Sequence, residues 1–284
     1  MHQHDLGLQH DLGLLRRRNV LRLLAGAGLA VVAGCSADDA TPGGSTPSTG
    51  TPSTGTPSAS TPSASTPTTG TSSTPTDVDE IPEETAGPYP GDGSNGPNVL
   101  TESGIVRSDI TKSFGSASGV ATGVPLTVEL LIMDAAKDSA LPGAAVYIWH
   151  CDAEGRYSLY DDEIGEENYL RGVQAADAQG KVTFTTIFPG AYQGRWPHIH
   201  FELYSSLSEA TAAGKIKSTS QLALPADVCN TVYASSGYDG SSQNMARTSL
   251  ENDMVFRDDG AEHQLATTTG SVQAGYQARL TVGV

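Results

Sequence analysis

Apolar and polar side chains alternate with a period of two along much of the C-terminal part of this chain. Leu126, Val128 and Leu130 would share one face of a strand, because successive side chains of a strand point to opposite faces. Turns containing glycine or proline separate such segments, and helical patterns are short, at 206–213 and 226–232. Many short strands without a βαβ rhythm predict an all-β fold, a β-sandwich with a few short helices. Further strands are expected at 146–150, 181–187, 198–204, 218–224 and 278–284.

A basic cluster and a short apolar run begin the chain. The arginines at 16–18 and Arg22 precede an apolar run at 23–34, which is too short to span a bilayer as a stable helix. Adjacent arginines before such a run are typical of the twin-arginine export route. The run ends in Val-Ala-Gly-Cys, similar to a bacterial lipobox, so we expect residues 1–35 to be an export signal and Cys35 to carry a lipid. An anchor helix with an incidental cysteine is the alternative.

The segment 41–76 contains only Thr, Pro, Gly, Ser and Ala. Such a segment cannot bury enough apolar surface to offset the entropy lost on folding. We therefore expect 36–76 to be a disordered stalk and 77–284 to be one folded domain, which is long enough to enclose a hydrophobic core. With a lipid on Cys35, this organisation predicts an exported protein that faces outside the cytoplasm and contacts the membrane only through its lipid anchor.

The charge balance excludes one class of partner. The chain carries 16 Lys+Arg against 32 Asp+Glu, a formal net charge of -16. Nucleic acids require a basic surface to neutralise their phosphates, so nucleic-acid binding is excluded. A mean hydropathy of -0.24 excludes a protein with many membrane spans. The acidic surface is consistent with simple solubility.

Three cysteines are present. If Cys35 carries the lipid, Cys151 and Cys229 are left in an exported, oxidising setting. Two remaining thiols in such a setting predict one disulfide between Cys151 and Cys229. Two buried free thiols are the alternative.

His198 and His200 are the first candidate metal ligands. They are two positions apart in an expected strand, so both imidazoles would face one side and could bind one metal ion. This signal is weak alone, because most such pairs are polar strand faces. A cupin would need a glutamate a few residues further on, and Glu202 is too close. A zinc hydrolase would need a third histidine or a carboxylate.

Tyrosines are better placed to complete a ligand set. Tyr157 follows the end of an expected strand, and Tyr192 lies in a Pro-Gly-Ala-Tyr turn six residues before His198. Phenolate is a hard, anionic oxygen ligand that favours Fe(III) over Fe(II). Two phenolates and two neutral imidazoles would leave a ferric centre with net charge +1, suited to an anionic dioxygenated substrate.

Several motifs in this region resemble the intradiol ring-cleavage dioxygenases, the family of the catechol and protocatechuate dioxygenases. The likeness covers about 85–284, essentially the whole expected domain. The matching pieces are Thr-Ala-Gly-Pro-Tyr (85–89), Trp-His-Cys-Asp-Ala-Glu-Gly-Arg-Tyr-Ser (149–158), Arg-Gly-Val-Gln (171–174), Thr-Ile-Phe-Pro-Gly-Ala-Tyr (186–192) and Arg-Trp-Pro-His-Ile-His (195–200).

The resemblance implies a β-sandwich that binds Fe(III), with Tyr157 as equatorial ligand, Tyr192 as axial ligand, and His198 and His200 as the two imidazole ligands. By the same resemblance, other residues surround the substrate: Arg195 stabilises negative charge on the ring, Gln221 lies on the strand behind the site, and Tyr89 lines the pocket. The substrates implied are a small aromatic diol and O2, and the product is a muconate-type diacid.

The chain also departs from the cytosolic members of that family. It has the low-complexity stalk in place of their long helical N-terminal region, and the stretch between Tyr192 and His198 is shorter than theirs. A more open site would accept bulkier substituted or lignin-derived catechols. Two other classes remain as alternatives: a metal-free, stalked β-sandwich that binds wall or plant polymer, and a transthyretin-like structural domain.

Overall fold

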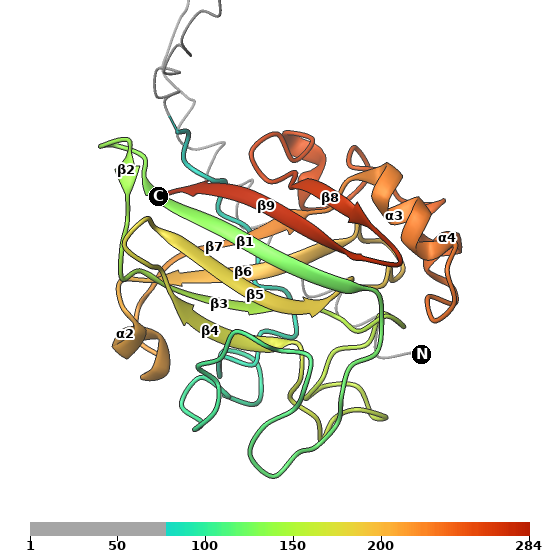
Figure 1. The fold of residues 1–284 in the computed structure, drawn as a ribbon, viewed down its shortest axis with the longest axis horizontal. Helices are drawn as coiled ribbons and strands as arrows, with labels where there is room; N and C mark the ends of the chain where they lie inside the picture. Colours follow the sequence, from blue (N-terminus) through green and yellow to red (C-terminus); the bar gives the residue numbers. More distant parts are fainter. Residues whose placement is uncertain (1–77) are drawn as a thin grey trace, which may run out of the picture.

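The computed structural model describes residues 78–284 (Figure 1). The predicted export signal at 1–35, the lipid on Cys35 and the stalk at 36–76 lie outside the described residues, so they stay predictions. Within 78–284 no helix is both long enough and apolar enough to cross a membrane.

Two sheets form the framework of the molecule, and this confirms the predicted β-sandwich. The first sheet has the order β2-β1-β9-β8, with β5 also pairing with β1. The strand β9 runs parallel to β1, and the other pairs of this sheet are antiparallel. The strands of this sheet are β1 (Pro125–Asp134), β2 (Ser139–Ala140), β5 (Lys181–Ile187), β8 (Thr267–Ser271) and β9 (Gly275–Gly283).

The second sheet contains four antiparallel strands in the order β4-β3-β6-β7. In Figure 1 it lies behind β1 and β9. Its strands are β3 (Ala145–Trp149), β4 (Arg171–Ala175), β6 (His198–Tyr204) and β7 (Ile216–Ala223).

Short helical segments follow the strands and cover the ends of the sandwich. Since His198 of β6 pairs with Ala223 of β7, the helix that follows β7 lies at the end of the sheet where β6 begins (Figure 1). The helical segments are α2 (Leu207–Thr211), α3 (Ala226–Tyr233), α4 (Ser241–Met245) and the 3-10 helix η1 (Phe256–Asp258).

The central strand β6 is buried along its whole length because each of its faces meets a hydrophobic cluster. Ile199, Phe201 and Leu203 point into the inter-sheet core, together with the alternating apolar residues of β1. The opposite face carries the two histidines and Tyr204, which belongs to a second, outer core with Tyr147 and other side chains. Both candidate histidine ligands therefore lie on the face away from the first sheet.

The predicted disulfide is wrong. Cys151 and Cys229 are both free and buried. The Cys151 thiol belongs to the outer core and donates a hydrogen bond of 3.4 Å to the carbonyl of Gly190, whereas Cys229 packs from α3 into the inter-sheet core. The two thiols are directed into different clusters, and burial raises the pKa of each above its ordinary value.

Candidate metal centre

The strand β6 brings His198 and His200 together. Because the two residues are separated by Ile199, whose side chain enters the inter-sheet core, both imidazoles project from the other face. Their Nε2 atoms lie 3.0 Å apart, and both side chains are buried. The Nδ1 atom of His198 lies 2.5 Å from the Trp196 carbonyl oxygen. That contact requires a proton on Nδ1, so the Nε2 atom of His198 presents a lone pair to the site.

A tight turn after β3 places Tyr157 beside these histidines. The carboxylate of Asp152 accepts hydrogen bonds from the backbone N–H groups of Glu154 and Arg156, at 2.9 and 3.0 Å. Gly155 adopts φ +85°, a conformation that favours glycine, and packs directly against Tyr192. This turn reverses the chain and directs the buried Tyr157 ring toward the histidines.

Tyr192 approaches from the loop between β5 and β6. Its hydroxyl oxygen lies 3.2 Å from the Nε2 atom of His198 and 3.4 Å from the hydroxyl oxygen of Tyr157. The short helix α4 fixes the preceding residue: Ser241 accepts a hydrogen bond from the backbone of Ala191, and Asn244 donates one. Unlike the other three candidate ligands, Tyr192 is partly exposed.

These four side chains form a donor set that fits a first-row transition metal. Neighbouring donor atoms are separated by 3.0–3.4 Å. Two ligands that each lie about 2.1 Å from one ion and meet at a right angle are separated by about 3 Å, so these spacings match a shared ion. Among residues 78–284 no group of three or more His, Cys, Asp or Glu could bind a metal. The tyrosines are thus essential to this set.

Burial controls the protonation of the candidate ligands. Burial and the nearby Arg195 lower the pKa of His198, and burial and His198 lower the pKa of His200. Both imidazoles are therefore neutral and can donate lone pairs. Burial, followed by the neighbouring Tyr192, raises the pKa of Tyr157 well above its ordinary value. A cation is needed to stabilise Tyr157 as a phenolate, which again fits a metal.

Aromatic rings and one glycine pack around His200 and Tyr157. The Trp149 ring stacks on His200 with centroids 4.8 Å apart. Gly87, in the segment 85–89, lies so close that a methyl group on it would be 3.3 Å from Cε1 of His200. The Tyr89 ring lies 5.0 Å from that of Tyr157, so the structure places it at the site.

Arg195 and Gln221 are adjacent on the inner wall of the site. The Nη2 atom of Arg195 donates a hydrogen bond of 2.6 Å to Oε1 of Gln221. Gln221 pairs with His200 across the sheet, and its Nε2 atom donates to the carbonyl of Thr85 at 2.8 Å. The structure therefore brings Arg195 and Gln221 into one cluster with the four candidate ligands and Tyr89.

Asp253 is the main residue that the sequence patterns did not reveal. Its Oδ2 atom accepts hydrogen bonds from Nε of Arg195 at 2.9 Å and from the backbone N–H of Trp196 at 2.6 Å. Burial opposes its ionisation, but Arg195 and the Trp196 N–H outweigh burial and keep the pKa of this carboxyl below its ordinary value. Asp253 belongs to no motif and is 58 positions from Arg195, so no local signal indicated it.

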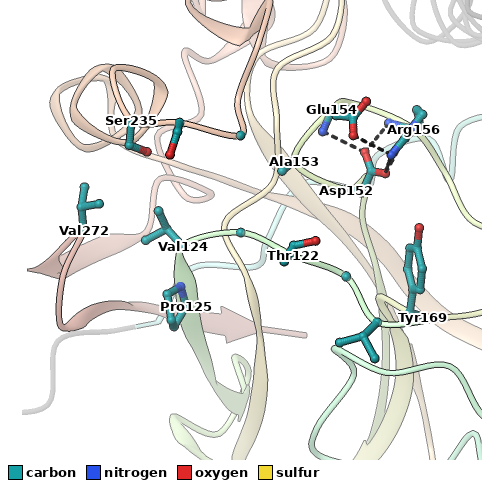
Figure 2. A pocket seen from close by; sticks show the side chains of 15 residues that line it. Thr122, Val124, Pro125, Asp152, Ala153, Glu154, Arg156, Tyr169, Ser235 and Val272 are labelled. Carbon is teal, nitrogen blue, oxygen red and sulfur yellow. Dashed lines mark hydrogen bonds and ion pairs between the residues drawn. The ribbon is translucent and has the colours of Figure 1, made fainter. Parts of the chain in front are cut away.

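A separate pocket of about 580 Å³ is lined in part by Asp152, Ala153, Glu154 and Arg156, from the turn that precedes Tyr157 (Figure 2). Figure 2 shows Asp152, Glu154 and Arg156 joined at one side of this pocket. None of the four candidate metal ligands lines it. The donor set, rather than this pocket, therefore defines the candidate site.

Comparisons with known proteins agree with this geometry. A family model described as dioxygenase matches residues 95–227. An intradiol ring-cleavage dioxygenase from Tetranychus urticae superposes with a TM-score of 0.56 at 26% identity, over 72% of this chain and 94% of that one. A second dioxygenase structure gives a TM-score of 0.55 at 27% identity, over 72% and 93% of the two chains.

A curated relative adds a local match. The chlorocatechol 1,2-dioxygenase of Pseudomonas sp. (strain P51) is 43% identical over 51 residues, which is 18% of this chain and 20% of the relative. The match thus spans about a fifth of that relative's length. The two-sheet fold and these similarities define an intradiol type of β-sandwich. The chain is similar in sequence and in fold to the intradiol ring-cleavage dioxygenases.

Proposed function

We propose that this protein is a non-haem Fe(III) dioxygenase. It would cleave a catechol-type ring between its two hydroxyl-bearing carbons with O2, giving a muconate-type diacid. The observation that carries this proposal is the convergence of two phenol oxygens and two imidazole nitrogens, with neighbouring donors 3.0–3.4 Å apart. Phenolate oxygen and neutral imidazole together suit a ferric ion.

Tyr157, Tyr192, His198 and His200 would hold the iron. A ferric ion bound there would supply Lewis-acid activation of the catechol oxygens. The burial of Tyr157, His198 and His200 excludes water from one side of the site and keeps the donors fixed. The packing of Trp149 against His200 adds to this rigidity.

Tyr192 is the candidate proton acceptor. It is the one partly exposed residue of the four, and its hydroxyl oxygen lies 3.4 Å from that of Tyr157 and 3.2 Å from Nε2 of His198. A catechol must lose its hydroxyl protons before the ring is electron-rich enough to react. The Tyr192 phenolate oxygen would take up one such proton as the substrate enters.

Arg195 is the candidate electrostatic partner of the ring. Its guanidinium is buried beside the donor set and is fixed before substrate arrives. Negative charge that develops on the ring during cleavage would meet this fixed positive charge in a site with little water.

The short connection between Tyr192 and His198 supports a broad substrate class. The two residues are six positions apart, and Tyr192 remains partly exposed. We propose that substituted catechols larger than catechol itself, such as lignin-derived ones, are accepted. We also propose that the enzyme acts outside the cytoplasm, tethered through a lipid on Cys35 and the stalk at 36–76, as the sequence patterns predict.

Iron content, visible absorption and ring cleavage of a panel of catechols test the activity together. We expect purified protein to carry iron, to show a burgundy colour from phenolate-to-iron charge transfer, and to open catechol rings. Tyr157→Phe should lose the iron and the colour. Tyr276→Phe, a control in the inter-sheet core, should keep both. Colourless wild-type protein that fails to cleave any catechol in the presence of iron would contradict the proposal and favour a metal-free binding module.

A further inference from the structure

Asp253 is buried at the point where a distant segment meets the candidate site. Its side chain is 0% exposed, and that of Arg195 is 3% exposed. A buried ion pair is retained only where its charges and hydrogen bonds are well satisfied, because taking the charges out of water is costly. This pair meets that condition, since four N–H groups surround the carboxylate.

The four hydrogen bonds divide between two tasks. The Oδ1 atom of Asp253 accepts from the backbone N–H groups of Val255 and Phe256, at 2.8 and 3.1 Å, and so caps the start of η1. The Oδ2 atom accepts from Nε of Arg195 and from the backbone N–H of Trp196, residues that lie shortly before β6. Capping of η1 needs only the two hydrogen bonds at Oδ1. The two hydrogen bonds at Oδ2 therefore require another explanation.

The hydrogen bond from Nε of Arg195 to Oδ2 of Asp253 fixes the guanidinium from one side. Gln221 holds it from the other side through Nη2, and Thr85 in turn holds Gln221. Phe256 supports the same group, with its ring centroid 6.0 Å from Cζ of Arg195. The guanidinium thus has its position set at two different nitrogens.

The same carboxylate oxygen also fixes the backbone that leads to His198. Asp253 binds the N–H of Trp196, and the carbonyl oxygen of Trp196 contacts Nδ1 of His198. The Phe256 ring, which the capped segment presents, packs edge-on against the His198 imidazole at 6.5 Å. One residue therefore connects the segment at 249–257 to both Arg195 and a candidate metal ligand.

We propose that Asp253 is a positioning residue that holds the Arg195 guanidinium where negative charge develops on the substrate. This inference rests on the proposed function. The hydrogen bonds of the Asp253 carboxylate go to Arg195 and to backbone N–H groups, so it acts on the reaction through Arg195. Without it, the guanidinium would keep its bond to Gln221 but lose the partner that fixes its second nitrogen.

The test uses Asp253→Asn, Arg195→Met and the double variant in the full-length, iron-loaded protein. Asp253→Asn should lower kcat roughly tenfold to a hundredfold with little change in KM and an unchanged iron content. In the double variant kcat should be no lower than in Arg195→Met alone, because Asp253 acts through the removed side chain. Asp177→Asn is the matched control: this aspartate caps two backbone N–H groups at 2.9 Å far from the site, and its loss should leave kcat unchanged.

The melting temperature of the metal-free variants gives a readout that does not depend on turnover. Each single variant leaves one charge of the buried ion pair without its partner, whereas the double variant leaves no unpaired charge. The loss of melting temperature in the double variant should therefore be smaller than the sum of the two single losses. If Asp253→Asn does not fold, the double variant and Arg195→Met still provide the comparison of kcat.

Three results would overturn the inference: wild-type kcat in Asp253→Asn, losses of kcat that multiply in the double variant, or a double variant whose melting temperature shows no coupling. Wild-type protein that binds iron but cleaves no catechol is a different outcome, because it overturns the proposed function itself. The two failures are therefore distinguishable.

Discussion

The indole ring of Trp149 lies almost flat on the imidazole of His200, with ring centroids 4.8 Å apart and planes 6° apart. The two residues are paired across β3 and β6. A metal-binding histidine is usually oriented by a hydrogen bond from its second nitrogen. The Nδ1 atom of His200 has no such protein partner among the described residues. The stacking of Trp149 and the close approach of Gly87 therefore orient this imidazole.

Replacing the stacked ring should weaken iron binding. In Trp149→Leu we expect iron affinity to fall roughly tenfold to a hundredfold, because His200 loses its orientation. The free energy of unfolding should also fall by about 3 kcal/mol, because the substitution leaves a cavity in the outer core. Competition with a chelator and thermal unfolding measure the two effects.

Phe184→Leu is the control for Trp149→Leu. Phe184 is equally buried but lies in the inter-sheet core, so its loss should lower stability without changing iron affinity. Equal iron affinity in Trp149→Leu and the wild type would contradict an orienting role for the stack.

A methyl group at Gly87 should disturb the same imidazole at its Cε1 atom. Gly87 has φ +70°, so Gly87→Ala costs about 1 kcal/mol in backbone strain, and the added carbon would lie 3.3 Å from Cε1 of His200. Gly115 also has φ +70° but has no atom within 4 Å of the corresponding position, so Gly115→Ala carries the backbone strain alone. Lower iron occupancy should appear only in Gly87→Ala. The same iron content in both variants would show that the close contact does not matter.

Strands in which apolar and polar residues alternate were predictable from the sequence. The expected strands at 181–187 and 198–204 match β5 and β6, and Leu126, Val128 and Leu130 are buried as expected. The strand β8 was not predicted. Its sequence, Thr-Thr-Thr-Gly-Ser, has no apolar alternation because it pairs at the edge of the sheet and none of its residues is buried.

The candidate site was predictable where a motif kept its residues close in sequence. The two histidines share a strand, and each tyrosine lies in a glycine-containing turn that the pattern indicates. Asp253 could not be found in this way, since only tertiary packing brings it to Arg195. The disulfide was predicted from compartment and cysteine count alone, and neither reports which core a thiol faces.

The free thiols make stability independent of reducing agent. We expect the same melting temperature with and without reductant, because both Cys151 and Cys229 are already reduced and buried. In a Cys35→Ala variant, a thiol reagent should label them only after unfolding. A lower melting temperature in reductant, or a Cys151–Cys229 peptide in non-reduced mass spectra, would show that the bond does form.

The lipid anchor makes a separate prediction, which concerns residues outside the described part of the chain. In cells that process lipoproteins, Cys35→Ala should abolish labelling with a fatty-acid probe and release the domain from the membrane fraction. Ring cleavage by the released protein should be unchanged, because Cys35 precedes the predicted stalk and the four candidate ligands all lie within 157–200. Membrane association that persists in Cys35→Ala would point to an anchor helix instead.

The central claim is that this protein opens the ring between the two hydroxyl-bearing carbons with both atoms of O2. Reaction of the iron-loaded protein with catechol under 18O2, followed by mass spectrometry of the product, tests it most directly. We expect a muconate-type diacid with one 18O in each of its two carboxyl groups. An aldehyde-containing product from cleavage beside the hydroxyl pair, or no product from iron-loaded protein, would contradict it.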